Sequence, residues 1–349
     1  MDAFLNTGPY NANYAGSYAG NYTASRAGYL DTMRMNEGID RLIDHFKEIA
    51  ASDPGKAAEL INEEQSGFYT LYILNPQIRE YGMMQHLNTR GRQALDLMDR
   101  ILNGKHNDIS ARARNDGEGM MTLSALKWMF VTGCPDDGLN NMFDELMELT
   151  AALLIKVFND DSILQNVADM IYDRNRKGLL IHHLVWAFFE ARNPLSLTLL
   201  AVHLLSAEED VVLTRKLLGF IPGIDEDIDR LRLYDNTVNW INGNCIFLRY
   251  TGESMHQSDR PIHYELCTEA KYLCKPVSVK DGEPVEPFTA EEKGLLEELK
   301  SLDDENVKLL ADCSLLLCRR NPGWRRIWLY YPITMRIDIA RNLTKGDPL

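Results

Sequence analysis

The apolar positions along most of the chain recur with the 3.6-residue period of an α-helix. One such run starts after residue 36 and another ends near residue 102, and each gathers its apolar side chains on one helical face. Their apolar positions are Ile39, Leu42, Ile43, Phe46 and Ile49, and Leu95, Leu97, Met98, Ile101 and Leu102. The pattern therefore predicts a mainly α protein.

Capping signals mark where several helices begin. Four Asx-Pro pairs place a capping side chain before a proline, which is favoured at the first helical position; they are Asp53-Pro54, Asn75-Pro76, Asn193-Pro194 and Asn321-Pro322. Two capping boxes are also predicted, Ser206 with Glu209 and Thr289 with Glu292. Residues 139–218 read as four successive helices with short connections, which predicts antiparallel neighbours in a bundle or a short solenoid.

The helical pattern breaks at residues 243–288. Residues 245–251 favour a β-strand between two glycines, and residues 277–282 could form one arm of a hairpin. We therefore expect a two-lobed helical bundle with a small β insertion near residues 244–280. The expected lobes are residues 31–240, which are helical, and residues 241–349, which are mixed and then helical.

Residues 1–30 form a low-complexity arm rich in Tyr, Gly, Asn and Ala. Tyr10, Tyr14, Tyr18 and Tyr22 recur every four residues, and no branched aliphatic residue lies between Leu5 and Leu30. Such a segment cannot bury enough apolar area to order itself, so we expect it to be disordered. Tyrosine offers a large contact area at low entropic cost, so we expect these four residues to mediate self-association, although an arm without a role is an equal alternative.

Charge is distributed unevenly along the chain. The formal net charge is −14, yet residues 319–345 hold six Arg and one Lys against the single acid Asp338, a net +6. Arginine binds phosphates through its planar fork, and neighbouring aromatic residues can stack on unpaired bases. The candidate nucleic-acid-binding residues are Arg112, Arg114, Arg174, Arg176, Lys177, Arg319, Arg320, Arg325, Arg326 and Arg336. The alternative is that these cations cap helix ends or pair with acids elsewhere in the chain.

No motif predicts a catalytic residue, a metal site or a cofactor. The stretch from Gly252 to His256 places Ser254 after a strand and His263 downstream, but His256 stands where the nucleophile turn of hydrolases needs glycine. The six cysteines lack the spacing of a zinc site, and no glycine-rich phosphate loop occurs. An enzyme site assembled from distant helices, such as Glu190, His203 and Asp210, stays open as an alternative.

We therefore expect a non-enzymatic structural protein that assembles with copies of itself through the arm. In the first reading it is a nucleoprotein or coat protein that binds single-stranded RNA without sequence preference, and its layout is similar to that of helical viral nucleoproteins. The runner-up is a helical adaptor or regulatory scaffold that binds protein partners. The absence of a long apolar stretch and of a secretory signal predicts a soluble protein with no membrane contact, cytoplasmic or inside a virion.

Overall fold

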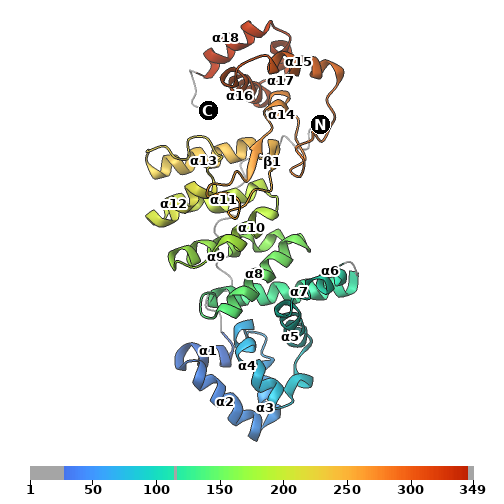
Figure 1. Ribbon diagram of the computed structural model, residues 1–349, viewed down its shortest axis with the longest axis vertical. Coiled ribbons are helices and arrows are strands. Elements are labelled where there is room, and N and C mark those ends of the chain that lie inside the picture. Colours follow the sequence, from blue (N-terminus) through green and yellow to red (C-terminus); the bar gives the residue numbers. More distant parts are fainter. Residues whose placement is uncertain (1–26, 114–115, 345–349) are drawn as a thin grey trace. The chain divides into compact units, whose positions relative to one another are not determined.

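The computed structural model describes residues 27–113 and 116–344, and most of them are helical (Figure 1). These residues divide into two compact units, one ending at Ala191 and the other beginning at Arg192. The division lies N-terminal to the lobe boundary expected at residue 240. Among the described residues, no helix is both long and apolar enough to cross a membrane.

The first unit contains ten α-helices in its described part. They are α1 (Tyr29–Glu37), α2 (Ile39–Ser52), α3 (Pro54–Ile61), α4 (Phe68–Glu80), α5 (Thr89–Leu102), α6 (His106–Arg112), α7 (Asp116–Gly133), α8 (Asn141–Lys156), α9 (Leu164–Arg176) and α10 (His182–Glu190). Short 3-10 helices connect some of them: η2 (Met83–His86), η3 (Cys134–Asp136) and η4 (Asp161–Ile163). Helix α8 packs against both α7 and α10, and α10 also packs against α9 (Figure 1).

Aromatic residues fill the core of the first unit between α4, α7 and α8. The ring of Phe68 lies 6.1 Å from that of Phe143 and meets Trp128 edge-on at 5.8 Å. An ion pair ties α1 to η3, because Arg34 donates hydrogen bonds of 2.7 and 3.0 Å to the two carboxylate oxygens of Asp136. Helix α1 starts at Tyr29, so the last two residues of the expected arm belong to this helical unit.

The described part of the second unit contains eight α-helices, three 3-10 helices and one small sheet. The α-helices are α11 (Leu197–Ala201), α12 (Glu208–Leu217), α13 (Arg230–Asn244), α14 (Thr268–Leu273), α15 (Ala290–Lys300), α16 (Asp304–Arg320), α17 (Pro322–Leu329) and α18 (Ile333–Thr344). The 3-10 helices are η5 (Pro194–Ser196), η6 (Val202–Leu205) and η7 (Cys245–Phe247). Helix α16 packs against α14, α17 and α18, and Trp328 and Tyr272 are fully buried among them.

The small β insertion is confirmed. Strand β1 (Leu248–Tyr250) pairs antiparallel with β2 (Tyr264–Leu266), and Arg249 lies opposite Glu265. Residues 277–284 form a separate tight turn, closed by an antiparallel bridge between Val277 and Pro284. The backbone N–H of Tyr250 in β1 donates a hydrogen bond to the carbonyl of Val279 in this turn.

Three of the four Asx-Pro pairs start helices as predicted. The side chains of Asp53, Asn193 and Asn321 accept hydrogen bonds from the first turns of α3, η5 and α17. The fourth prediction was wrong, because Pro76 lies inside α4. Buried Leu74 and Ile78 flank the proline, and their packing outweighs the one backbone hydrogen bond that Pro76 removes.

One of the two predicted capping boxes forms. Thr289 and Glu292 exchange the reciprocal hydrogen bonds at the start of α15. Ser206 does not cap α12, whose N-cap position is Ala207, and its carbonyl instead accepts a hydrogen bond from Arg230.

Candidate functional site

Arg174, one of the arginines predicted to bind nucleic acid, is buried and fully engaged inside the first unit. Its Nε and Nη2 donate hydrogen bonds of 2.6 Å to the two carboxylate oxygens of Asp137. Its remaining donors reach Glu148 and the carbonyls of Leu180, at 3.3 Å, and Asp144, at 3.1 Å. All five N–H donors of the guanidinium therefore have acceptors, and with 3% of its surface exposed Arg174 cannot contact a nucleic acid.

The charge of Arg174 is stabilised by the acids around it, although the side chain is buried. Burial alone would lower the pKa of the guanidinium, but the hydrogen bonds and charges of Asp137 and Glu148 raise it above its ordinary value. A buried charge that is fully hydrogen-bonded and paired is stable, whereas the same charge without its partners is costly. Arg174 thus fixes the α7–α8 connection, which carries Asp137, against the turn between α9 and α10, which carries Leu180.

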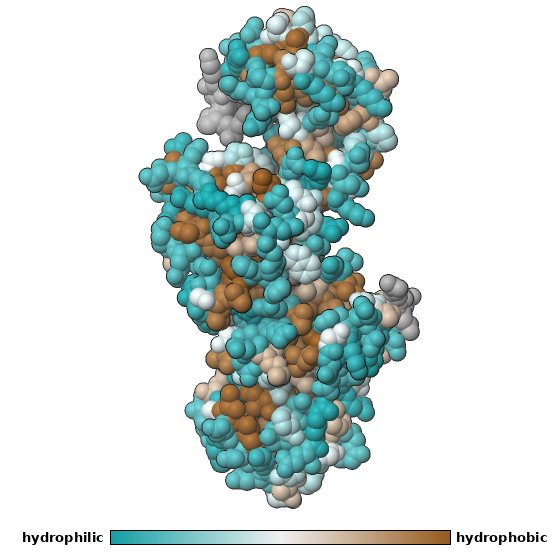
Figure 2. Space-filling view, in the orientation of Figure 1, coloured by the Kyte–Doolittle hydropathy of each residue, from teal (hydrophilic) through white to brown (hydrophobic). Residues whose placement is uncertain are grey.

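These two connections, together with the first turn of α8, expose apolar side chains where polar ones are expected. The exposed fractions are 65% for Leu139, 55% for Met142, 40% for Leu179 and 76% for Leu180. The two connections touch, because a Cβ added at Gly138 would lie 3.3 Å from a terminal carbon of Leu179. We call Leu139, Met142, Leu179 and Leu180 the leucine patch. Figure 2 shows that hydrophobic residues reach the visible face of the molecule in several separate places.

The other basic candidates of the first unit are bound to acids of their own chain. Arg112 lies 3.1 Å from the carboxylate of Asp96. Burial raises the pKa of Asp96, but the hydrogen bonds and charges of Arg100 and Arg112 outweigh burial, so the pKa is lowered overall. Lys177 lies 2.6 Å from the carboxylate of Asp173, and Arg176 lies 3.8 Å from it. These contacts are exposed and weak, so they leave the cations accessible. Arg114 lies outside the described residues, as do Tyr10, Tyr14, Tyr18 and Tyr22.

In the second unit, three arginines of the C-terminal block hold the fold together. Arg336 is buried, with 1% of its surface exposed, and donates hydrogen bonds to Glu298 and to the hydroxyl of Tyr272. Arg325 donates to the carbonyl of Tyr272 at 2.9 Å and to Ser314 at 2.8 Å. Arg319 is exposed, but it donates to the carbonyl of Gly243 at 2.9 Å. Arg336 thus drops out of the candidate interface, and Arg325 has a structural role.

Helices α16 and α17 still present cations to solvent near their junction. Arg319, Arg320 and Arg326 are exposed. Ile327 of α17 and Tyr330, which directly follows this helix, are also exposed, with exposed fractions of 55% and 62%. This part of the predicted block keeps the basic and aromatic character that a phosphate-bearing or acidic partner requires.

Ser254 and His263, the serine and histidine of the hydrolase-like stretch, each contact a residue of the segment around them. The hydroxyl of Ser254 donates to Gln257 at 3.4 Å, while the Nδ1 of His263 lies 3.1 Å from the carbonyl of Glu253. Burial lowers the pKa of His263 to about 4, so its imidazole is neutral at physiological pH. Of the other enzyme candidates, Glu190 belongs to the first unit, and His203 and Asp210 belong to the second.

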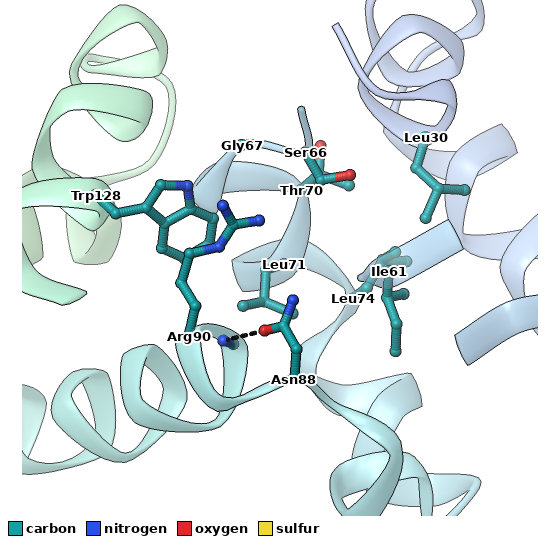
Figure 3. A pocket seen from close by; sticks show the side chains of 11 residues that line it. Leu30, Ile61, Ser66, Gly67, Thr70, Leu71, Leu74, Asn88, Arg90 and Trp128 are labelled. Carbon is teal, nitrogen blue, oxygen red and sulfur yellow. Dashed lines mark hydrogen bonds between the residues drawn. The ribbon is translucent and has the colours of Figure 1, made fainter. Parts of the chain in front are cut away.

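A small pocket in the first unit is lined by residues of α4 and α5 together with Trp128 (Figure 3). Its cavity of about 10 Å³ has room for one water molecule. Arg90 closes one side, because its guanidinium lies 4.5 Å from the ring centroid of Trp128 and donates to the carbonyls of Glu63 and Glu64. Among the described residues, no group of three or more His, Cys, Asp or Glu is arranged to hold a metal ion.

Comparisons with known proteins add no functional assignment. No protein-family model matches the chain, and neither a curated protein sequence nor a solved structure shows a significant match to it. Two features of the structure were not predicted from the sequence, the leucine patch and a pair of cysteines described below. Leu139 and Leu179 directly follow Gly138 and Gly178, and apolar residues after turn glycines are the signal that could have revealed the patch.

Proposed function

We propose that the protein is a non-enzymatic helical scaffold that assembles with copies of itself, and that the tyrosine-bearing arm of one copy binds the leucine patch of another. The observation that carries the proposal is the patch itself: three exposed leucines on two connections that the buried Arg174 fixes in place, and the exposed Met142 in the first turn of α8. Exposed apolar residues that cluster on a rigid support are typical of interaction sites.

The arm suits this surface in its chemistry. Residues 1–26 contain only two charged side chains, Asp2 and Arg26, and these cancel. An uncharged segment is not repelled by a protein of net charge −14, whereas a polyanion is. Tyrosine rings pack well on leucine side chains, and the thioether of Met142 adds a favourable contact with an aromatic ring.

Binding of the arm to another copy would lead to assembly. An arm of one copy that binds a different surface on the next copy makes a heterologous contact, which generates rings or open filaments. Such a contact is apolar, so we expect assembly to persist at high salt.

Sedimentation velocity over a range of protein concentrations tests the proposal. We expect the intact protein to sediment as species larger than a 39.8 kDa monomer, and the variant Leu180→Asp to sediment as the monomer. The matched control is Leu231→Asp, which changes an exposed leucine of α13 (58% exposed) and should leave assembly intact. An intact protein that is monomeric at every concentration contradicts self-assembly and favours the adaptor alternative, in which the patch binds another protein.

A second candidate function, the binding of single-stranded RNA, is favoured by the exposed Arg319, Arg320 and Arg326 and by the exposed Tyr330 at the C-terminal end of α17. Such binding would be sequence-indifferent and would weaken steeply as salt is raised. The ratio of absorbance at 260 nm to that at 280 nm in the purified protein tests it. A ratio typical of protein free of nucleic acid, together with no binding of a single-stranded RNA at low salt, would rule it out.

A further inference from the structure

Two cysteines that are far apart in the sequence meet between helices α14 and α16 of the second unit. Cys274 directly follows α14, and Cys318 lies in the last turn of α16, one turn after Ser314. The Sγ of Cys274 lies 3.7 Å from the carbonyl oxygen of Ser314 and 3.9 Å from its hydroxyl. The thiol of Cys274 also hydrogen-bonds to the sulfur of Cys318. The two sulfurs are therefore neighbours, and both residues are half-buried.

Cys274 has a backbone conformation that glycine adopts more easily than cysteine does. Its φ of 56° and ψ of 37° lie in the left-handed region, where a helix usually ends on glycine. Gly104 and Gly178 have φ of 69° and 68° after α5 and α9, so the chain does use glycine in this conformation elsewhere. At Cys274 a side chain is retained in spite of the steric cost, and that side chain contacts the sulfur of Cys318.

The surroundings favour ionisation of one sulfur only. The hydrogen bond that Cys274 donates lowers the pKa of Cys318, and the positive charges of Arg325 and Arg319 lower it further against the effect of burial. The same hydrogen bond raises the pKa of Cys274, and burial adds to it. Burial also raises the pKa of the remaining four cysteines, Cys134, Cys245, Cys267 and Cys313. Cys318 is thus the nucleophilic sulfur among the six, with a protonated thiol beside it.

We propose that Cys318 and Cys274 form a reversible disulfide when the protein meets hydrogen peroxide. The thiolate of Cys318 attacks one peroxide oxygen, the O–O bond breaks, and hydroxide leaves and takes a proton to become water. The Cys318 sulfenic acid is then attacked by the sulfur of Cys274, which loses its proton as the S–S bond forms and a second water leaves. Two thiols are oxidised and one peroxide is reduced, and a dithiol such as dithiothreitol restores the reduced pair by exchange.

Peptide mapping by mass spectrometry tests the proposal on the intact protein. After treatment with hydrogen peroxide and alkylation of the remaining thiols, we expect a disulfide-linked peptide that joins Cys274 to Cys318, and its loss after dithiothreitol. In Cys274→Ser the resolving thiol is gone, so a sulfenic acid at Cys318 should be trapped by dimedone. The control Cys313→Ser removes a buried cysteine outside the proposed pair, and its linked peptide should form as in the unchanged protein.

A competition experiment separates a reactive pair from two cysteines that are merely close. With limiting iodoacetamide at pH 6.5, we expect Cys318 to be labelled at least about tenfold faster than Cys267, which is also half-buried but whose pKa burial raises, because only the thiolate reacts. Labelling at equal rates, or peroxide-treated protein that keeps both thiols free or links other cysteines, would overturn the proposal.

Discussion

Replacing Arg174 by methionine should destabilise the first unit strongly, although it removes no apolar contact from the core. Methionine fills much of the arginine stem's volume, so the change isolates the loss of the guanidinium. Asp137, 2% exposed, would be left as a buried carboxylate without its cation, and the carbonyls of Asp144 and Leu180 would lose their donor. Breaking a buried, hydrogen-bonded ion pair by removing one partner costs about 3–5 kcal/mol.

Urea unfolding followed by far-UV circular dichroism measures this loss. With an m-value of about 2 kcal/mol per molar urea, the midpoint for the first unit should fall by roughly 1.5–2.5 M. The matched control is Arg176→Met on the same helix, whose guanidinium is exposed and lies 3.8 Å from Asp173. That variant should change the free energy of unfolding by less than about 0.5 kcal/mol.

Removing both charges distinguishes a structural ion pair from a general loss of packing. In the double variant Arg174→Met, Asp137→Leu, no unpaired Asp137 carboxylate is left buried, so part of the lost stability should return. The reasoning is refuted if Arg174→Met unfolds at the same urea concentration as Arg176→Met. It is also refuted if the losses of stability of Arg174→Met and of Asp137→Leu simply add up in the double variant.

Two further predictions concern the second unit. Because burial lowers the pKa of His263 to about 4 in the folded protein, against 6.5 when unfolded, the unfolded state binds the extra proton and stability is lost as pH falls from 6.5 towards 4. Unfolding of the unchanged protein and of His263→Gln at pH 7 and pH 4 should show that His263 accounts for about 3 kcal/mol of the loss, and equal losses in the two proteins would disprove it. In the RNA-binding alternative, changing Arg319, Arg320 and Arg326 together to Gln should abolish retention of a single-stranded RNA, whereas Arg176→Gln should not; RNA retained equally by both variants would contradict a role for α16 and α17.

Local features of the structure were predictable because their partners lie within a few residues of one another. The capping box at Thr289 and Glu292 and the cap at Asn321 depend on residues three apart, and both form. The exception shows the limit of such signals. Asn75 and Pro76 resemble a helix start, but the packing of Leu74 and Ile78 carries α4 through the proline.

The roles of the arginines were not predictable in the same way. The acceptors of Arg174 come from positions 137, 144, 148 and 180, on separate elements that only the tertiary fold brings together. Arg336 and Glu298 are likewise 38 residues apart. A cluster of basic residues in the sequence therefore identified cations without indicating which of them pair internally. Cys274 and Cys318 were missed for the same reason, since Cys274 directly follows α14 and Cys318 lies in α16, and only the tertiary fold brings them together.

The most direct test of self-assembly is the binding of a synthetic peptide of residues 1–26 to protein that lacks those residues, measured by fluorescence polarisation. We predict saturable binding that persists at high salt, that is lost with Leu180→Asp and that is retained with Leu231→Asp. No binding, or equal binding to the unchanged and Leu180→Asp proteins, would contradict the proposal that the arm of one copy binds the leucine patch of another.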